Sequence, residues 1–220
     1  MFRGDASDAV RGQDDWSRSV KAYYRDIETY DWVDVADHIR GPEAIFHRAR
    51  QRLIRKVVSQ FPHASYLDAG CGTGLILRDL PPTSIGLDLN PRNIDLVRQR
   101  LPQHMAIVGD IEGMPFNSSS FDGAVCTEVL EHVPNPVLAL IELNRVLKPG
   151  GVLIGTVPAR SPIWRLRFLS STCPHDEPFH HQYSASQIVN MLESFKILTV
   201  RYVLLGTNVL FIARKTVTLG

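Results

Sequence analysis

The chain has 220 residues, of which 44% are hydrophobic and 21% charged, and its formal net charge is +1. This length and composition predict one globular domain with a modest extension, and the near-neutral charge does not favour nucleic acid as a partner. Three cysteines without C-x-x-C spacing argue against a disulfide framework, and no apolar run is long enough for a signal peptide or a membrane span, so we expect a cytoplasmic protein.

The N-terminal quarter changes character twice. Residues 1–17 are polar and show no periodicity, so we expect them to be mobile. Aromatic residues then become frequent up to residue 39, and Gly41-Pro42 ends that stretch. Residues 43–60 carry an apolar stripe with helical spacing, which predicts a helix.

The basic residues of this predicted helix have two interpretations. They form a solvated face of a packing helix, or they belong with nearby aromatic residues to a lid over a substrate pocket. In the second interpretation the lid includes Tyr23, Tyr24, His47 and Arg48, of which the last three would contact the substrate. An anionic or membrane-bound substrate would suit them. The sequence leaves both interpretations open.

Residues 65–74, which read S-Y-L-D-A-G-C-G-T-G, predict the feature around which the chain is organised. An apolar run ending at Asp68 gives way to Gly70, Gly72 and Gly74, and apolar residues resume at 75–77. This pattern predicts a buried strand, a loop and the first turn of a helix. Glycines let the backbone approach a ligand closely, and a nucleotide-like cofactor is the expected occupant.

The rest of the chain alternates between predicted strands and helices. Strands are predicted at 84–88, 105–109, 121–127 and 152–157, with helices at 91–101 and 136–147 and a turn at 148–151. This alternation predicts an α/β fold, a doubly wound parallel sheet. An irregular insertion at 159–183 and a helix at 184–194 follow, and the strands 196–204 and 208–215 must pair antiparallel because only three residues join them.

Acidic residues follow the predicted strands where a doubly wound sheet binds its ligands. Asp88 comes 20 positions after Asp68 and could accept both hydroxyls of a ribose. Asp110 could accept from the exocyclic amine of a purine, with Ile111 packing on the ring. The register of these acids with the glycine loop predicts a nucleoside-containing cofactor.

Five blocks resemble the class I S-adenosylmethionine-dependent methyltransferases, in particular the small-molecule subgroup that includes quinone-biosynthesis C-methyltransferases. The blocks lie within residues 65–158 and read L-D-A-G-C-G-T-G, G-L-D-L-N, G-D-I-E-G-M-P-F, F-D-G-A-V-C-T-E-V-L-E-H-V and L-N-R-V-L-K-P-G-G-V-L-I-G-T-V-P. The resemblance implies a Rossmann-like sheet of seven strands in the order 3-2-1-4-5-7-6, with strand 7 antiparallel. It also implies S-adenosylmethionine as cofactor, in-line methyl transfer to a small-molecule acceptor, an extension with lid helices at 1–60 and a cofactor-binding domain at 61–220.

The same resemblance implies the cofactor site residue by residue. The glycine loop would lie against the methionyl group, Asp68 would bind its ammonium, and Asp88 would hold the ribose. The full set of implied cofactor-binding residues is Asp68, Gly70, Cys71, Gly72, Gly74, Asp88, Leu89, Asp110, Ile111, Thr127 and Glu128.

A general base is needed only for an acceptor that keeps its proton at neutral pH. His132 and Glu128 are the first candidates for this role, although a packing role for His132 is an equal alternative. Acceptor contacts are expected from Tyr24, His47, Arg48, His175, His180 and His181. The three histidines of the insertion lack regular ligand spacing, so we expect no metal.

Other functions stay open at this point. A catalytically inactive S-adenosylmethionine-binding regulator or partner protein would keep the same glycines and acids. An NAD-linked oxidoreductase is disfavoured because the loop does not follow the G-x-G-x-x-G spacing. The sequence does not define the acceptor, the methylated atom, the choice between monomer and homodimer, or peripheral membrane contact.

Overall fold

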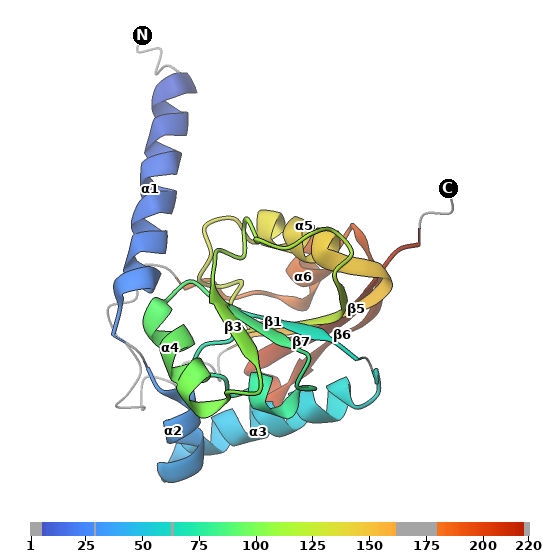
Figure 1. The fold of residues 1–220 in the computed structure, drawn as a ribbon. Helices are drawn as coiled ribbons and strands as arrows, with labels where there is room; N and C mark the ends of the chain where they lie inside the picture. Colours follow the sequence, from blue (N-terminus) through green and yellow to red (C-terminus); the bar gives the residue numbers. More distant parts are fainter. Residues whose placement is uncertain (1–5, 29, 63, 162–179, 218–220) are drawn as a thin grey trace.

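A computed structural model describes residues 6–28, 30–62, 64–161 and 180–217 of the chain, with side chains described from residue 14 onward (Figure 1). None of the helices within these ranges is long and apolar enough to cross a membrane.

One seven-stranded sheet forms the centre of the molecule, in the order β3-β2-β1-β4-β5-β7-β6. Strands β1 to β5 pair in parallel, and β7 runs antiparallel to both β5 and β6. This order and the antiparallel β7 confirm the predicted fold class. The strands are β1 Tyr66–Ala69, β2 Ile85–Asp88, β3 Met105–Val108, β4 Phe121–Thr127, β5 Leu147–Pro158, β6 Phe195–Val203 and β7 Asn208–Lys215.

Helices cover both faces of the sheet (Figure 1). Side chains of α3 and α4 enter one buried apolar cluster, and side chains of α5 and α6 enter a second cluster. Such burial of two sheet faces is the main source of stability in this layered architecture. The helices are α1 Ala6–Asp26, α2 Trp32–His38, α3 Pro42–Val58, α4 Pro91–Arg100, α5 Pro136–Val146 and α6 Ala185–Met191.

Residues 1–17 are predicted to be mobile, but the structure has a helix over most of this segment. Helix α1 begins at Ala6 and projects from the body of the molecule, with its C-terminal end close to α4 (Figure 1). Its exposed turns are supported locally, for example by Arg18 Nη2, which lies 2.6 Å from Asp15 Oδ1 one turn earlier. The end of α1 is held by Arg92, which donates to the carbonyls of Asp26 and Ile27. The few apolar residues of this polar helix, such as Trp16, Val20 and Tyr23, do recur at helical spacing, but the sequence interpretation did not use that signal.

The glycine loop is followed by a shorter element than predicted. Residues 75–77 do not begin an α-helix, and only the 3₁₀ helix η1, Leu77–Asp79, forms. Two prolines follow at once, and Leu80 before Pro81 is extended, with φ −88° and ψ 161°. A residue before proline avoids the helical region, which explains why the helix stops.

The turn predicted at 148–151 lies inside the long strand β5. Phe121 pairs with Leu147 and Gly123 pairs with Val152, so β5 carries three extra residues opposite this part of β4. Gly150 takes the positive φ of 79° that the resulting bulge requires.

The two ends of the predicted insertion at 159–183 meet. Ala159 and Tyr183 form an isolated parallel bridge, and the Tyr183 N–H donates to the carbonyl of Pro158. The described parts of the insertion therefore return the chain to the end of β5.

Gly155 of β5 tests how tightly the centre of the sheet is packed. A Cβ at this position would lie 2.2 Å from Phe211 Cζ and 2.6 Å from the carbonyl oxygen of Cys126. We expect Gly155→Ala to lower the free energy of unfolding by about 1–3 kcal/mol, measured by urea denaturation, because a buried backbone must move. Gly113→Ala is the control, since a Cβ there meets nothing within 4 Å. Equal midpoints for the two variants would contradict this packing.

Candidate functional site

A cavity of about 790 Å³ opens at the carboxyl ends of the parallel strands. Its walls come from the loop after β1, the ends of β2, β3 and β4, and residues of α1 and α3. Ligands of doubly wound sheets bind at this edge, where the strand order reverses. The cavity therefore lies where the strand-end acids were predicted to act.

The glycine loop forms one wall of the cavity. Gly70, Gly72 and Gly74 all have positive φ, of 79°, 51° and 93°. Gly70 and Gly72 line the cavity, together with the buried Cys71, whose thiol pKa is raised by burial. Gly74 does not line it, because a Cβ there would point at Leu101, 2.9 Å away. Gly74 thus allows close packing against the end of α4, which differs from its predicted contact with the cofactor.

Asp68 on β1 is a buried carboxylate that faces this cavity. Its side chain belongs to a residue that is only 1% exposed, and its Oδ2 accepts no hydrogen bond from any described residue. Burial raises the pKa of Asp68 to about 7, with a smaller contribution from the charge of Asp88. A buried carboxylate oxygen without a donor is costly, so the site suits a ligand that brings a cation or an N–H group.

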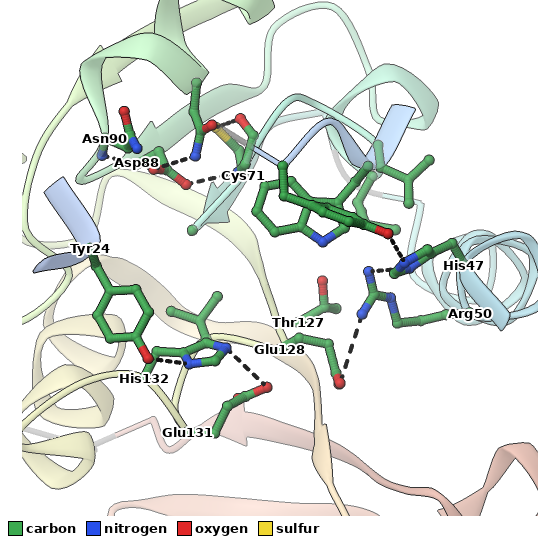
Figure 2. Close-up of a pocket in the computed structure, with 18 of the residues that line it drawn as sticks. Tyr24, His47, Arg50, Cys71, Asp88, Asn90, Thr127, Glu128, Glu131 and His132 are labelled. Carbon is green, nitrogen blue, oxygen red and sulfur yellow. Dashed lines mark hydrogen bonds and ion pairs between the residues drawn. The ribbon is translucent and has the colours of Figure 1, made fainter. Parts of the chain in front are cut away.

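Asp88 at the end of β2 connects three neighbouring segments (Figure 2). Its Oδ2 accepts from the N–H of Gly72 at 2.8 Å, and its Oδ1 accepts from the N–H of Asn90 at 2.9 Å and from Asn93 Nδ2 at 3.0 Å. A carboxylate has about four acceptor sites, so these three donors leave capacity for one more. Leu89 follows on the same wall of the cavity.

The end of β3 contacts the N-terminal helix. Lys21 Nζ lies 2.6 Å from Asp110 Oδ2 and 2.5 Å from Glu112 Oε2, and Asp110 Oδ1 accepts from the N–H of Glu112. Asp110 and Ile111 both line the cavity. The ion pairs from Lys21 fix α1 against this end of the cavity, an arrangement that the sequence did not predict.

The end of β4 places Thr127 and Glu128 on the cavity wall. Glu128 has a positive φ of 55°, and its Oε1 accepts from Thr156 Oγ1 and Asn208 Nδ2, both at 2.8 Å. Its Oε2 lies 3.7 Å from Arg50 Nη1. The carboxylate is therefore held by neighbouring strands on one side and by a cation on the other.

Arg50 and His47 of α3 are buried at the cavity, with exposed fractions of 6% and 7%. Arg50 Nη2 lies 3.4 Å from His47 Nδ1, and its buried Nε has no hydrogen-bond partner among the described residues. The sequence interpretation did not single out Arg50. The signal was its spacing, because positions 44, 47, 50, 54 and 57 form one buried stripe that includes both residues.

Arg48 points elsewhere and does not line the cavity. Its Nη1 donates to the carbonyl of Ala36 at 2.8 Å, which ties α2 to α3. This contact differs from the predicted role of Arg48 in the substrate pocket. The basic face of α3 is thus divided between packing and the cavity.

Some of the predicted histidines line the cavity and others do not. His132 and His180 both line the cavity with ring centroids 5.1 Å apart, and Tyr24 Oη lies 2.9 Å from His132 Nδ1 (Figure 2). His181 is exposed and contributes its backbone N–H to the carbonyl of Glu131. His175 lies outside the described residues.

The sequence profile of the methyltransferase domain family matches residues 67–155. The malonyl-[acyl-carrier protein] O-methyltransferase of Serratia marcescens is 35% identical over 111 residues, which are 49% of this chain and 44% of that protein. The ubiquinone biosynthesis O-methyltransferase of Xanthomonas campestris is 30% identical over 132 residues, 56% of this chain and 55% of that protein. The chain thus spans about half the length of these curated relatives.

Solved structures share the fold at low sequence identity. The magnesium protoporphyrin IX methyltransferase of Synechocystis PCC 6803, solved with bound SAH, has a TM-score of 0.70 at 16% identity, over 90% of this chain and 99% of that chain. The [4+2]-cyclase SpnF has a TM-score of 0.66 at 19% identity, over 96% of this chain and 93% of that chain.

The strand order, the glycine loop at the cavity and the match to the family profile agree with one another. Residues 67–155 match the methyltransferase domain family, and the described residues have the Rossmann-like fold of the class I methyltransferases.

Proposed function

We propose that the chain binds S-adenosylmethionine in this cavity and transfers its methyl group to a small-molecule acceptor by direct in-line displacement. The observation that carries the proposal is the buried Asp68 carboxylate, whose Oδ2 has no donor at the wall of the cavity. An amino acid ammonium would supply both the missing donor and the compensating charge. Residues 61–220 would bind the cofactor, and residues 1–60 would form the extension and lid.

The remaining cofactor contacts follow from the cavity walls. Gly70, Cys71 and Gly72 would lie against the methionyl group, because the loop there has no side-chain bulk at its glycines. Asp88 would use its one remaining acceptor site for a ribose hydroxyl, which is one fewer than the two hydroxyls that the sequence predicted. Asp110 would accept from the adenine amine, with Leu89 and Ile111 packing on the ring, and Thr127 and Glu128 would border the methyl group.

Arg50 completes this assignment as the partner of the cofactor's carboxylate. Its guanidinium is buried at the cavity, its Nε–H has no hydrogen-bond partner in the described part of the chain, and its contact with Glu128 is longer than a hydrogen bond. A carboxylate between Arg50 and the ammonium site at Asp68 would satisfy both groups. Arg50 lowers the pKa of Asp68 through its charge, which agrees with a position close to that site.

The chemistry needs little from the protein beyond placement. Bound S-adenosylmethionine supplies a methyl carbon made electrophilic by its sulfonium. The chain's residues would hold the acceptor in line with that carbon and exclude water. Glu128 is held by Thr156 and Asn208, so it suits a positioning role better than that of a general base. His132 lies at the acceptor side and would contact the acceptor.

The acceptor would occupy the part of the cavity beyond Glu128. Tyr24, His47 and His180 line the cavity together with the apolar residues Phe46 and Val133. This mixture suits a partly apolar molecule with a polar tip. The curated relatives named above are O-methyltransferases by name, which supports methyl transfer by this chain. Their names do not identify the acceptor of this chain.

The first experiment is parallel titration calorimetry with S-adenosylmethionine, S-adenosylhomocysteine and NAD. Micromolar binding of the first two and none of NAD is the expected result, and no binding of either sulfur compound would contradict the proposal. An acceptor screen with labelled methyl groups then separates an enzyme from an inactive binding protein. This second step is needed because the same fold also occurs in a protein described as a cyclase.

Asp68→Asn tests the buried carboxylate without ligand. A pKa of about 7 lies above the ordinary value of about 4, so the ionised form is disfavoured in the folded chain. The stability contributed by the protonated form is present below pH ~4 and is lost as the pH rises to ~7, by roughly 3–5 kcal/mol in total. Relative to wild type, we expect the variant to gain stability over this range in urea unfolding. A difference between variant and wild type that does not change with pH would contradict the burial argument.

Asp88→Ala tests the ribose assignment. We expect S-adenosylhomocysteine to bind about 10- to 150-fold more weakly by calorimetry, because charge-assisted hydrogen bonds contribute ~1.5–3 kcal/mol. Asp95→Ala, which removes an exposed carboxylate from the following helix, should bind like wild type. Unchanged affinity in Asp88→Ala would remove Asp88 from the site.

Arg50→Ala tests the carboxylate assignment with two ligands. We expect weaker binding of S-adenosylhomocysteine by ~1.5–3 kcal/mol, and unchanged binding of methylthioadenosine, which lacks the methionine carboxylate and ammonium. Arg48→Ala is the matched control on the same helix, because its side chain packs against α2. Equal losses for both ligands in Arg50→Ala would indicate a general disturbance of the cavity.

A further inference from the structure

Three potential metal ligands meet on the acceptor side of the cavity. Glu131 and His132 follow β4, whereas His180 lies 48 positions after His132 and precedes α6. One ligand atom from each of these residues lies within 4.8 Å of the other two, and all three residues line the cavity. Because the chain separation is large, no local sequence spacing could predict this cluster.

The distance between His132 Nε2 and Glu131 Oε1 fits two ligands of one ion better than a direct hydrogen bond between the side chains. His132 Nε2 lies 3.8 Å from Glu131 Oε1, which is too long for a hydrogen bond. Two ligands about 2.0–2.1 Å from a tetrahedral zinc ion lie ~3.3 Å apart. A side-chain movement of about half an ångström would therefore place this pair around an ion.

The ring of His132 is already oriented for such a role. Tyr24 Oη lies 2.9 Å from Nδ1, so Nε2 is the nitrogen that faces Glu131 (Figure 2). Metal-binding histidines commonly use their second nitrogen for a partner that fixes the ring. Metal binding through Nε2 would use the tautomer in which Nδ1–H donates to Tyr24.

The backbone holds His180 beside the segment that follows β4. The N–H of His181 donates to the carbonyl of Glu131 at 3.1 Å, and Tyr183 Oη donates to the carbonyl of Leu130 at 2.9 Å. These bonds fix the end of the insertion against residues 130–131. Glu131 is only 1% exposed, so its carboxylate lies buried at the inner side of this cluster.

We propose that Glu131, His132 and His180 bind one divalent transition-metal ion. Two imidazoles and one carboxylate are a ligand set for Zn²⁺ and for other first-row ions, whereas Mg²⁺ and Ca²⁺ prefer oxygen ligands alone. This assignment replaces the expectation of no metal, which rested on the spacing of His175, His180 and His181. His181 is exposed and takes no part in the cluster.

Three protein ligands leave a coordination position open for water or substrate. The three residues line the cavity, so that position faces the acceptor region. If the open position holds the acceptor, an inference that rests on the proposed methyltransferase function, then the acceptor would present an oxygen or nitrogen donor to the metal. Acceptors with a hydroxyl, carboxylate or amine near the methylated atom form that class.

Co²⁺ is the probe for this site because its visible absorption reports the ligands directly. The chain, prepared without a histidine tag and treated with a chelator, is titrated with Co²⁺ in the absence of any cofactor. We expect one equivalent to bind with an intense visible band, Zn²⁺ to displace it, and excess Mg²⁺ to leave it bound. Tyr24→Phe, which keeps the ring, should weaken Co²⁺ binding by about 10- to 100-fold.

Matched variants separate the cluster from surface binding. Glu131→Gln and His180→Ala should lose the band, while His181→Ala, one position from His180, should keep it. Unfolding of each variant is followed by circular dichroism, and only folded variants are compared. Absence of Co²⁺ and Zn²⁺ binding by the wild type overturns the proposal, and so does equal binding by His180→Ala and His181→Ala.

Calorimetry with S-adenosylhomocysteine on the same samples keeps the two proposals apart. Loss of the band in His180→Ala with unchanged S-adenosylhomocysteine binding supports the metal site independently of the cofactor site. A wild-type chain that binds Co²⁺ but no S-adenosylhomocysteine would overturn the proposed function and leave the metal site standing.

Discussion

The carboxylate of Asp88 joins the parts of the molecule on which the cavity depends. It accepts from the glycine loop after β1, from the backbone at the start of α4 and from Asn93 within α4. The loop has positive φ at its glycines, and a short stretch in that conformation keeps its shape only when its neighbours hold it. One partly buried acid thus connects the first strand crossover to the second, and the shape of the cavity floor depends on that connection.

Much of the fold could be predicted because local and global signals agreed in the central region. The strands from β1 to β4 are short apolar runs that end in acids or glycines, and the caps Asn90, Asn135 and Ser184 mark the starts of α4, α5 and α6. Local signals were weaker at the N-terminus. Helix α1 is mostly polar, so its few apolar residues, such as the buried Val20, give a weak signal, and its ion pairs and its contact with Arg92 leave none.

The site was predictable where one residue sits at one strand end, and less so where side chains converge from distant segments. Asp68, Asp88 and Asp110 all line the cavity as their strand-end positions indicated. Arg50 belongs to the site because α3 crosses over the loop, and Lys21 because α1 reaches the end of β3. Arg48 and Gly74 fall outside it for the same reason, since their directions depend on the packing of α2 and α4. Tertiary packing decided these four positions.

Helix α1 touches both ends of the cavity within a single turn. Lys21 binds the acids after β3, and Tyr24 contacts His132 after β4. Both contacts depend on the same docked position of the helix, so the free energy of docking is common to the two ends. A ligand at one end that favours the docked helix raises the affinity for a ligand at the other end, and the second ligand raises the affinity for the first by the same factor. Occupancy of the two halves of the cavity is therefore thermodynamically linked.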